Sequence, residues 1–336
     1  MDNNNSDEQT AANNIFIPLS IILVLLGLIG PGFWKIKSPD FNFQSTLMPT
    51  RSSMNLNNVN SNLIKLDQKY LNSSLSTKDI FNKEIAVAWS NEVIENATIN
   101  FKVPKIFFSQ LPNDLNTYQI RERKNLFISI ILPLLVRGNQ LVLEERDEII
   151  KSFEIKQFSK LKVFCLKYKL DLKNCNINND TSLKKIRLLK EKLLLRVNIF
   201  PLSMMLAQAT IESGWGMSRF AKKGNALFGQ WTWSINKGIK PRENQNSNFA
   251  VKSFKNLQGS VNSYILNLNT HPAYAKLRKY RNFVLINGQK FDGKNFAKYL
   301  EKYAEIGYKY VEKVIKMIKI NKFDKYDKLK FEKFQS

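Results

Sequence analysis

An uninterrupted apolar run near the start of the chain is the strongest feature of its hydrophobic pattern. Residues 15–33 contain nineteen residues without a charge, close to the roughly 20 that cross a bilayer as a helix. We predict a transmembrane helix or an uncleaved signal anchor here. A cleaved signal peptide is the rival interpretation, but its positive leading segment is missing, since Asp2, Asp7 and Glu8 precede the run. A buried helix of a soluble domain is a further alternative.

Helical spacing of apolar residues predicts several helices after this run. The range 117–159 is the longest, and Pro133 should kink or break it. Its stretch FISIILPLLV is too short for a second membrane span and is flanked by Arg and Lys residues, which favours a buried core helix. The other helices are expected at 77–96, 161–168, 182–197 and 201–213.

The segment around Glu212 carries the candidate chemistry. A helix should begin at Pro201, which suits a first turn, and end at Gly214, because glycine terminates helices. Glu212 then lies in the last turn, on the same face as Gln208. The negative helix end and the apolar Trp215 should raise the pKa of Glu212, whereas nearby cations should lower it. A carboxyl that holds its proton near neutral pH suits a general acid. A glutamate that merely ends a helix in water is the alternative.

Two alternating segments, 230–235 and 249–254, predict a small β-hairpin with a loop between them. Glu243, in that loop, is the only carboxylate between residues 213 and 291. It is therefore the sole candidate in this stretch for a second catalytic acid. An exposed loop glutamate is the alternative.

The residues around Glu212 also match a known pattern. LAQATIESGWGMSRFAKKGNALFGQ resembles A-Q-x-x-x-E-S-x-W-G followed by N-x-F-G, the signature of the bacterial glucosaminidase domains of glycoside hydrolase family 73. Two later segments, NLNTHPAYAKLR and YLEKYAEIGYKYVEKVIKMI, are similar to the family segments N-P-x-Y and Y-A-x-x-x-x-Y, with Glu305 where many relatives have an Asp. The matching signature positions are Ala207, Gln208, Glu212, Ser213, Trp215, Gly216, Asn225, Phe228 and Gly229.

This resemblance implies a fold and a reaction. It implies a mainly α (α+β) chain with a lysozyme-like glucosaminidase domain and a small β lobe. The domain would act as an endo-beta-N-acetylglucosaminidase that hydrolyses the β-1,4 bond after N-acetylglucosamine in peptidoglycan. Glu212 would be the general acid, and Glu243 or the substrate's own acetamido group would assist at the developing cation. The residues expected to bind substrate are Gln208, Trp215, Asn225, Phe228, Tyr274 and Tyr303. Packing in the core is the favoured alternative for Trp215 and Phe228. A catalytically silent wall-binding or scaffold protein with the same fold is the alternative.

A second resemblance extends upstream over roughly residues 101–318, where VPKIFFSQLPNDL and RERKNLFISIILPLLVRGNQLVLEER are similar to bacterial Bax-type proteins. Together the patterns divide the chain into six parts. We predict a disordered tail at 1–14, the membrane helix or anchor at 15–33, a tether at 34–76, a helical lead-in region at 77–182, the glucosaminidase domain at 183–320 and a basic tail at 321–336.

The formal net charge of +24 favours an anionic partner. Peptidoglycan glycan strands fit, because their stem peptides carry carboxylates, and the membrane is the second expected partner, through residues 15–33. A nucleic-acid-binding protein would also be basic. No nucleic-acid motif is recognisable, so nucleic acid is not expected as a partner.

The charges around the apolar run conflict with the predicted chemistry. Lys35, Lys37 and Arg51 follow the run and no Lys or Arg precedes it, so the positive-inside rule favours a cytoplasmic body. Peptidoglycan hydrolysis requires the opposite. Because the enzyme signature is the more specific signal, we predict a membrane-anchored protein with its catalytic domain in the periplasm or facing the cell wall.

The remaining reactive residue types are few. Cys165 and Cys175 could pair in an oxidising compartment, but two cysteines make no metal site. The single histidine, His271, precedes Pro272 and is expected at a turn or cap rather than in catalysis. No metal ion and no cofactor is expected.

Overall fold

The computed structural model describes residues 83–242 and 248–331 of the chain. The predicted membrane helix at 15–33, the tether and Glu243 lie outside these residues. The described part is mainly helical with a small three-stranded sheet, so the predicted fold class is confirmed. The helices are α3 (Lys83–Ile99), α4 (Ile120–Glu154), α5 (Phe158–Lys167), α6 (Leu172–Cys175), α7 (Leu183–Arg196), α8 (Leu202–Ser213), α9 (Arg219–Gly224), α10 (Leu257–Thr270), α11 (Ala275–Ile286), α12 (Gly293–Ala297) and α13 (Tyr308–Ile320).

The small sheet has the strand order β2–β4–β3, from β2 (Trp231–Thr232), β4 (Ala250–Lys252) and β3 (Gly238–Ile239), all antiparallel. The predicted pairing of 230–235 with 249–254 is confirmed. The prediction of a plain loop between them is wrong, because β3 pairs with the other edge of β4. Strand β3 has only two residues, too few to show an alternating pattern in the sequence. Its pairing with β4 requires glycine at position 238, since a Cβ there would lie 2.6 Å from the carbonyl oxygen of Val251.

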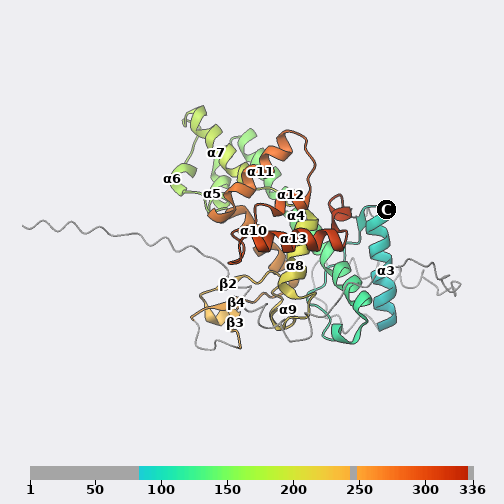
Figure 1. Ribbon diagram of the computed structural model, residues 1–336. Helices are drawn as coiled ribbons and strands as arrows, with labels where there is room; N and C mark the ends of the chain where they lie inside the picture. Colours follow the sequence, from blue (N-terminus) through green and yellow to red (C-terminus); the bar gives the residue numbers. More distant parts are fainter. Residues whose placement is uncertain (1–82, 243–247, 332–336) are drawn as a thin grey trace, which may run out of the picture.

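Helix α8 is the centre of the core. Every residue of α8 except Ile211 is buried, including the fully enclosed Met205 and Leu206. A helix that is apolar on all sides belongs inside a protein, and each such side chain contributes about 2 kcal/mol through burial. Helices α4, α12 and α13 pack around α8, with α13 crossing it near the middle of the molecule (Figure 1).

Helix α4 is the long apolar helix expected from the sequence. It runs without a break through Pro133 and packs against α3, α8 and α10. Within the described ranges, α4 alone is long and apolar enough to cross a membrane by length and composition, and most of its apolar stretch is buried inside the protein. Its apolar face therefore belongs to the same hydrophobic core as α8.

The segment expected as a basic tail folds back onto the core. A short 3-10 helix, η6 (Phe323–Tyr326), buries Phe323 and Tyr326, and β5 (Lys330–Phe331) pairs in parallel with β1 (Lys102–Val103). Between them, Asp327 accepts hydrogen bonds from the backbone N–H and the hydroxyl of Ser203, both at 2.8 Å. The carboxylate thus caps the first turn of α8, where the helix dipole favours negative charge.

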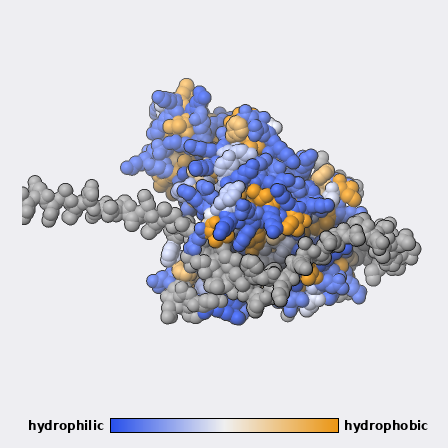
Figure 2. Space-filling view, in the orientation of Figure 1, coloured by the Kyte–Doolittle hydropathy of each residue, from blue (hydrophilic) through white to orange (hydrophobic). Residues whose placement is uncertain are grey.

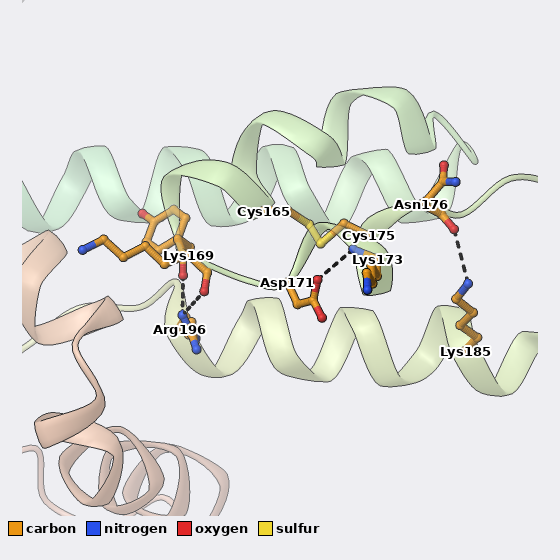
Figure 3. The surroundings of a disulfide bond; sticks show 9 residues. Cys165, Lys169, Asp171, Lys173, Cys175, Asn176, Lys185 and Arg196 are labelled. Carbon is orange, nitrogen blue, oxygen red and sulfur yellow. Dashed lines mark hydrogen bonds between the residues drawn. A yellow bond between two sulfur atoms is a disulfide. The ribbon is translucent and has the colours of Figure 1, made fainter. Parts of the chain in front are cut away.

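Cys165 and Cys175 form a disulfide that joins α5 to α6 (Figure 3). Outside the core, hydrophilic residues dominate the visible face, and hydrophobic ones appear in small groups (Figure 2).

We predict that Gly293→Ala destabilises the protein by about 3 kcal/mol, because overpacking a closed contact has a cost of this order. A Cβ on Gly293 would lie 2.0 Å from the hydroxyl oxygen of Ser203, at the start of α8. The matched control is Gly259→Ala in α10, where a Cβ would meet nothing closer than 3.4 Å. The control should be neutral or more stable by up to about 1 kcal/mol. Denaturant unfolding measures both, and equal stabilities would contradict the predicted contact.

Candidate functional site

Glu212 lies in the last turn of α8, as the sequence predicts. The helix ends at Ser213, and Gly214 caps it in the left-handed conformation with φ 58°. Trp215 follows with φ 58° as well, a conformation that a bulky residue rarely adopts. The chain therefore turns sharply after Glu212, and the carboxyl stays close to the core instead of reaching into solvent.

The carboxyl of Glu212 is buried and only partly satisfied. The residue is 4% exposed, and its Oε1 accepts a hydrogen bond of 2.8 Å from the hydroxyl of Tyr310. Its Oε2 is buried without a hydrogen-bond partner among the described residues. Burial raises the pKa of Glu212 to about 7, against the opposing effects of the Tyr310 hydrogen bond and of Lys313. The sequence predicts that desolvation raises the pKa of Glu212 and that nearby cations lower it, and in the structure desolvation has the larger effect.

A directed chain of hydrogen bonds leads to this carboxyl. The hydroxyl of Tyr264 donates to Oε1 of Gln208, and Nε2 of Gln208 donates to the hydroxyl oxygen of Tyr310 at 3.0 Å. Tyr310 in turn donates to Glu212. Gln208 orients the Tyr310 hydroxyl and so influences Glu212 through Tyr310. The side chain of Gln208 is fully buried.

Stacked aromatic rings pack against the tyrosines of this hydrogen-bond chain. Tyr303 lies parallel to Tyr310 at 5.1 Å, and Phe228 lies parallel to Tyr264 at 3.9 Å. The hydroxyl of Tyr303 donates to the backbone carbonyl of Phe228 at 2.9 Å, and the ring of Tyr274 lies 6.2 Å from that of Tyr303. Tyr303, Tyr274 and Phe228, all predicted to bind substrate, are each 3% exposed or less in this structure. Their rings thus pack in the core next to the acid.

Trp215 and Asn225 lie around the same turn. The half-buried ring of Trp215 contacts Phe127 and Phe323 edge-on, and the ammonium of Lys124 lies 4.8 Å from its centre. Asn225 caps α9 with φ 52°, and its Nδ2 donates to the carbonyl of Phe254 at 3.1 Å. The Oδ1 of Asn225 is buried and accepts no hydrogen bond from any residue that the structure describes.

Tyr310 is the residue that sequence reasoning missed. The family segment Y-A-x-x-x-x-Y, started at Tyr303, puts its second Tyr at position 309, where this chain has Lys. Tyr310 is the next residue, and it is fully buried, whereas Tyr308 is 63% exposed. A one-residue shift of the motif, together with the inward face of α13, would have identified it.

The described residues include no metal site. No group of three or more His, Cys, Asp and Glu side chains within them could hold a metal ion. His271 accepts a hydrogen bond from the N–H of Ala273 at 3.2 Å, so the predicted role as a cap is confirmed. Glu212 is therefore a buried carboxyl whose pKa is raised to about 7, which suits it to giving up a proton.

Comparisons with known proteins agree with the sequence pattern. Residues 189–323 match the glucosaminidase family, described as mannosyl-glycoprotein endo-beta-N-acetylglucosaminidase. The chain is also similar to Protein bax of Escherichia coli (strain K12), with 35% identity over 182 residues. That alignment covers 52% of this chain and 60% of the relative, so the chain spans less than two thirds of the relative's length. No solved structure matches the chain.

We predict that Glu212→Gln gains stability relative to the wild type as pH rises. The folded-state pKa of about 7 lies above the ordinary 4.5, so the folded protein holds a proton that the unfolded chain loses between these values. Wild-type stability should therefore fall through this window by about 3 kcal/mol, because each pKa unit corresponds to about 1.4 kcal/mol. The Gln variant lacks this loss. Unfolding free energies of both proteins at pH 4.5, 6 and 8 measure the effect, and a difference independent of pH would contradict the buried acid.

Proposed function

We propose that this chain, which belongs with the Bax-type proteins that carry a glucosaminidase domain, is a peptidoglycan hydrolase. The bond cleaved would be the β-1,4 bond after N-acetylglucosamine, which makes the protein an endo-beta-N-acetylglucosaminidase of the family 73 type. One observation carries the proposal. Glu212, at the signature position of the family, is a buried carboxyl with a pKa raised to about 7.

In this proposal Glu212 is the general acid. A carboxyl with a pKa near 7 is largely protonated in neutral or mildly acidic solution, so it can protonate the glycosidic oxygen as the bond to the leaving sugar breaks. The proton would sit on Oε2, the oxygen without a partner among the described residues. After transfer, the Tyr310 hydroxyl stabilises the carboxylate by its hydrogen bond to Oε1.

A second group must assist at the sugar carbon. Either Glu243 activates water there, or the acetamido group of the substrate attacks from within the same sugar. Between residues 213 and 291 the sequence offers no other carboxylate. Gln208, Tyr303, Tyr274 and Phe228 would act mainly by holding Glu212 and Tyr310 in place. Of the six residues expected to bind substrate, only Trp215 is partly accessible in this structure.

We further propose that residues 15–33 anchor the protein in a membrane and that the catalytic domain faces the cell wall. The alternative is a wall-binding or scaffold protein without turnover. The low exposure of Glu212, at 4%, favours that alternative, because a general acid must reach its substrate. Product analysis separates the two.

We predict that Glu212→Gln loses about a thousandfold or more of its turnover, within the range seen when a general acid is removed, while it still folds. Purified peptidoglycan would be digested by wild type and variant in parallel, and the released fragments reduced with borohydride and analysed by mass. Reduced N-acetylglucosamine ends from the wild type alone are expected. Reduced or anhydro muramic ends would move the cut to the other bond. No release by either protein, in material that a control enzyme digests, would favour the scaffold role.

The pH dependence of kcat/KM should report the same proton. We predict that activity falls as pH rises through about 7, because the free enzyme then loses the proton of Glu212. Since the Tyr310 hydrogen bond lowers the pKa of Glu212, Tyr310→Phe should move this alkaline limb of the pH profile, where activity falls, to higher pH by up to about one unit. Tyr303→Phe is the matched control, because its hydroxyl bonds a backbone carbonyl instead. An unmoved limb in Tyr310→Phe, or an equal shift in the control, would contradict the assignment.

A further inference from the structure

A basic cavity lies away from Glu212, among α6, α7 and the start of α11. It has a volume of about 340 Å³, the lower end of the range for small-ligand sites. Four of its lining residues are cations and one is a carboxylate: Lys192, Arg196, Arg278, Lys279 and Asp171. The family signature around Glu212 contributes nothing to its walls.

Arg278 is the best-fixed cation of this cavity. It is 5% exposed, and its Nη1 donates to the backbone carbonyls of Leu268 and His271, both at 2.9 Å. Its Nε and Nη2 make no hydrogen bond to any described residue. The guanidinium is therefore held through Nη1, and the three N–H donors of Nε and Nη2 remain free.

Arg196, a second cation that lines the cavity, is fixed in the same way. Its Nη1 donates to the backbone carbonyls of Tyr168 and Lys169, at the end of α5 (Figure 3). The disulfide between Cys165 and Cys175 closes the loop that carries these carbonyls and Asp171 (Figure 3). A covalent link therefore sets the position of one wall of the cavity.

The charge in the cavity is not neutralised. Among residues 83–242 and 248–331, no carboxylate forms an ion pair with any of the four cations. Asp171 instead accepts the N–H of Lys173 at 2.9 Å with its Oδ1 and caps α6. Burial, and then the neighbouring Arg196, lower the pKa of Arg278 to about 10. This is the effect expected of two partly desolvated cations that lie near each other without an ion-paired carboxylate.

We propose that this cavity binds a phosphate group, either as free phosphate or on a glycerol headgroup. Four cations against one carboxylate leave a surplus that suits a phosphate better than a single carboxylate. Two fixed guanidiniums present forked donors to its oxygens. Backbone carbonyls satisfy one edge of each guanidinium without removing its charge, so the free edges remain for an anion. The site is independent of the hydrolysis proposed for Glu212.

Isothermal titration of the full chain in a non-ionic detergent tests the site with three ligands: inorganic phosphate, glycerophosphoglycerol and D-alanyl-D-alanine. The test variant is Lys192→Gln with Lys279→Gln, which removes two lining cations and leaves the carbonyl-bound arginines in place. The matched control is Lys184→Gln with Lys276→Gln, on the same two helices but outside the cavity. Net charge changes equally in both double variants.

The wild type should bind at least one of the two phosphate compounds. The test variant should bind it about a hundredfold more weakly, at roughly tenfold for each lost charge-assisted contact. The control should stay within about twofold, because Lys184 and Lys276 do not line the cavity and exposed charges outside a site contribute little. Tighter binding of inorganic phosphate identifies a free ion as the ligand, and tighter binding of glycerophosphoglycerol identifies a lipid or polymer headgroup. The proposal is overturned if neither phosphate compound binds, if D-alanyl-D-alanine binds as tightly, or if both double variants lose affinity equally.

Discussion

The hydrogen bond from Tyr310 to Glu212 is the contact on which the organisation of the site depends. It joins α13 to the end of α8 across 98 residues of sequence, and it gives a buried carboxyl its one described partner. An unpaired buried carboxylate is costly, so the group keeps its proton until the pH reaches about 7. Burial of α8 on all sides therefore creates both the stability of the core and the proton affinity of its last turn.

This arrangement requires that both ends of α8 be held from distant parts of the chain. At its start, Asp327 accepts from Ser203 across 124 residues. At its end, Gly214 turns the chain back and Tyr310 meets the carboxyl. The C-terminal segment after α13 is therefore part of the framework of the site. Aromatic stacking of Tyr303 on Tyr310 restricts the position of the hydroxyl further, at 5.1 Å between ring centres.

Local features of this structure were predictable from sequence, and distant pairings were not. The bounds of α8 follow from Pro201 and Gly214, and the pairing of β2 with β4 follows from alternation, because each depends on neighbouring residues. The role of Tyr310 depends on how α13 rotates against α8, and the cap from Asp327 depends on how the last residues fold back. The same limit applies to β3, whose two residues carry no periodic signal. Cys165 and Cys175 are the two cysteines of the sequence, so within the chain each could pair only with the other. Whether the disulfide forms depends on the ends of α5 and α6 meeting.

The end of α7 shows how a strongly basic chain can place charge inside a fold. Arg281 is 1% exposed and donates to the carbonyls of Leu195 and Asn198, while Arg146 donates to those of Leu194 and Val197. These carbonyls lie at or just beyond the negative end of the helix, which favours cations. Lys outnumbers Arg in this sequence, but one ammonium cannot bridge separate carbonyls as a planar fork can. Because carbonyl dipoles stabilise these cations without cancelling their charge, this region remains positive as a whole. One end of the core therefore holds a carboxyl that favours its neutral form, and the other holds cations that favour an anion.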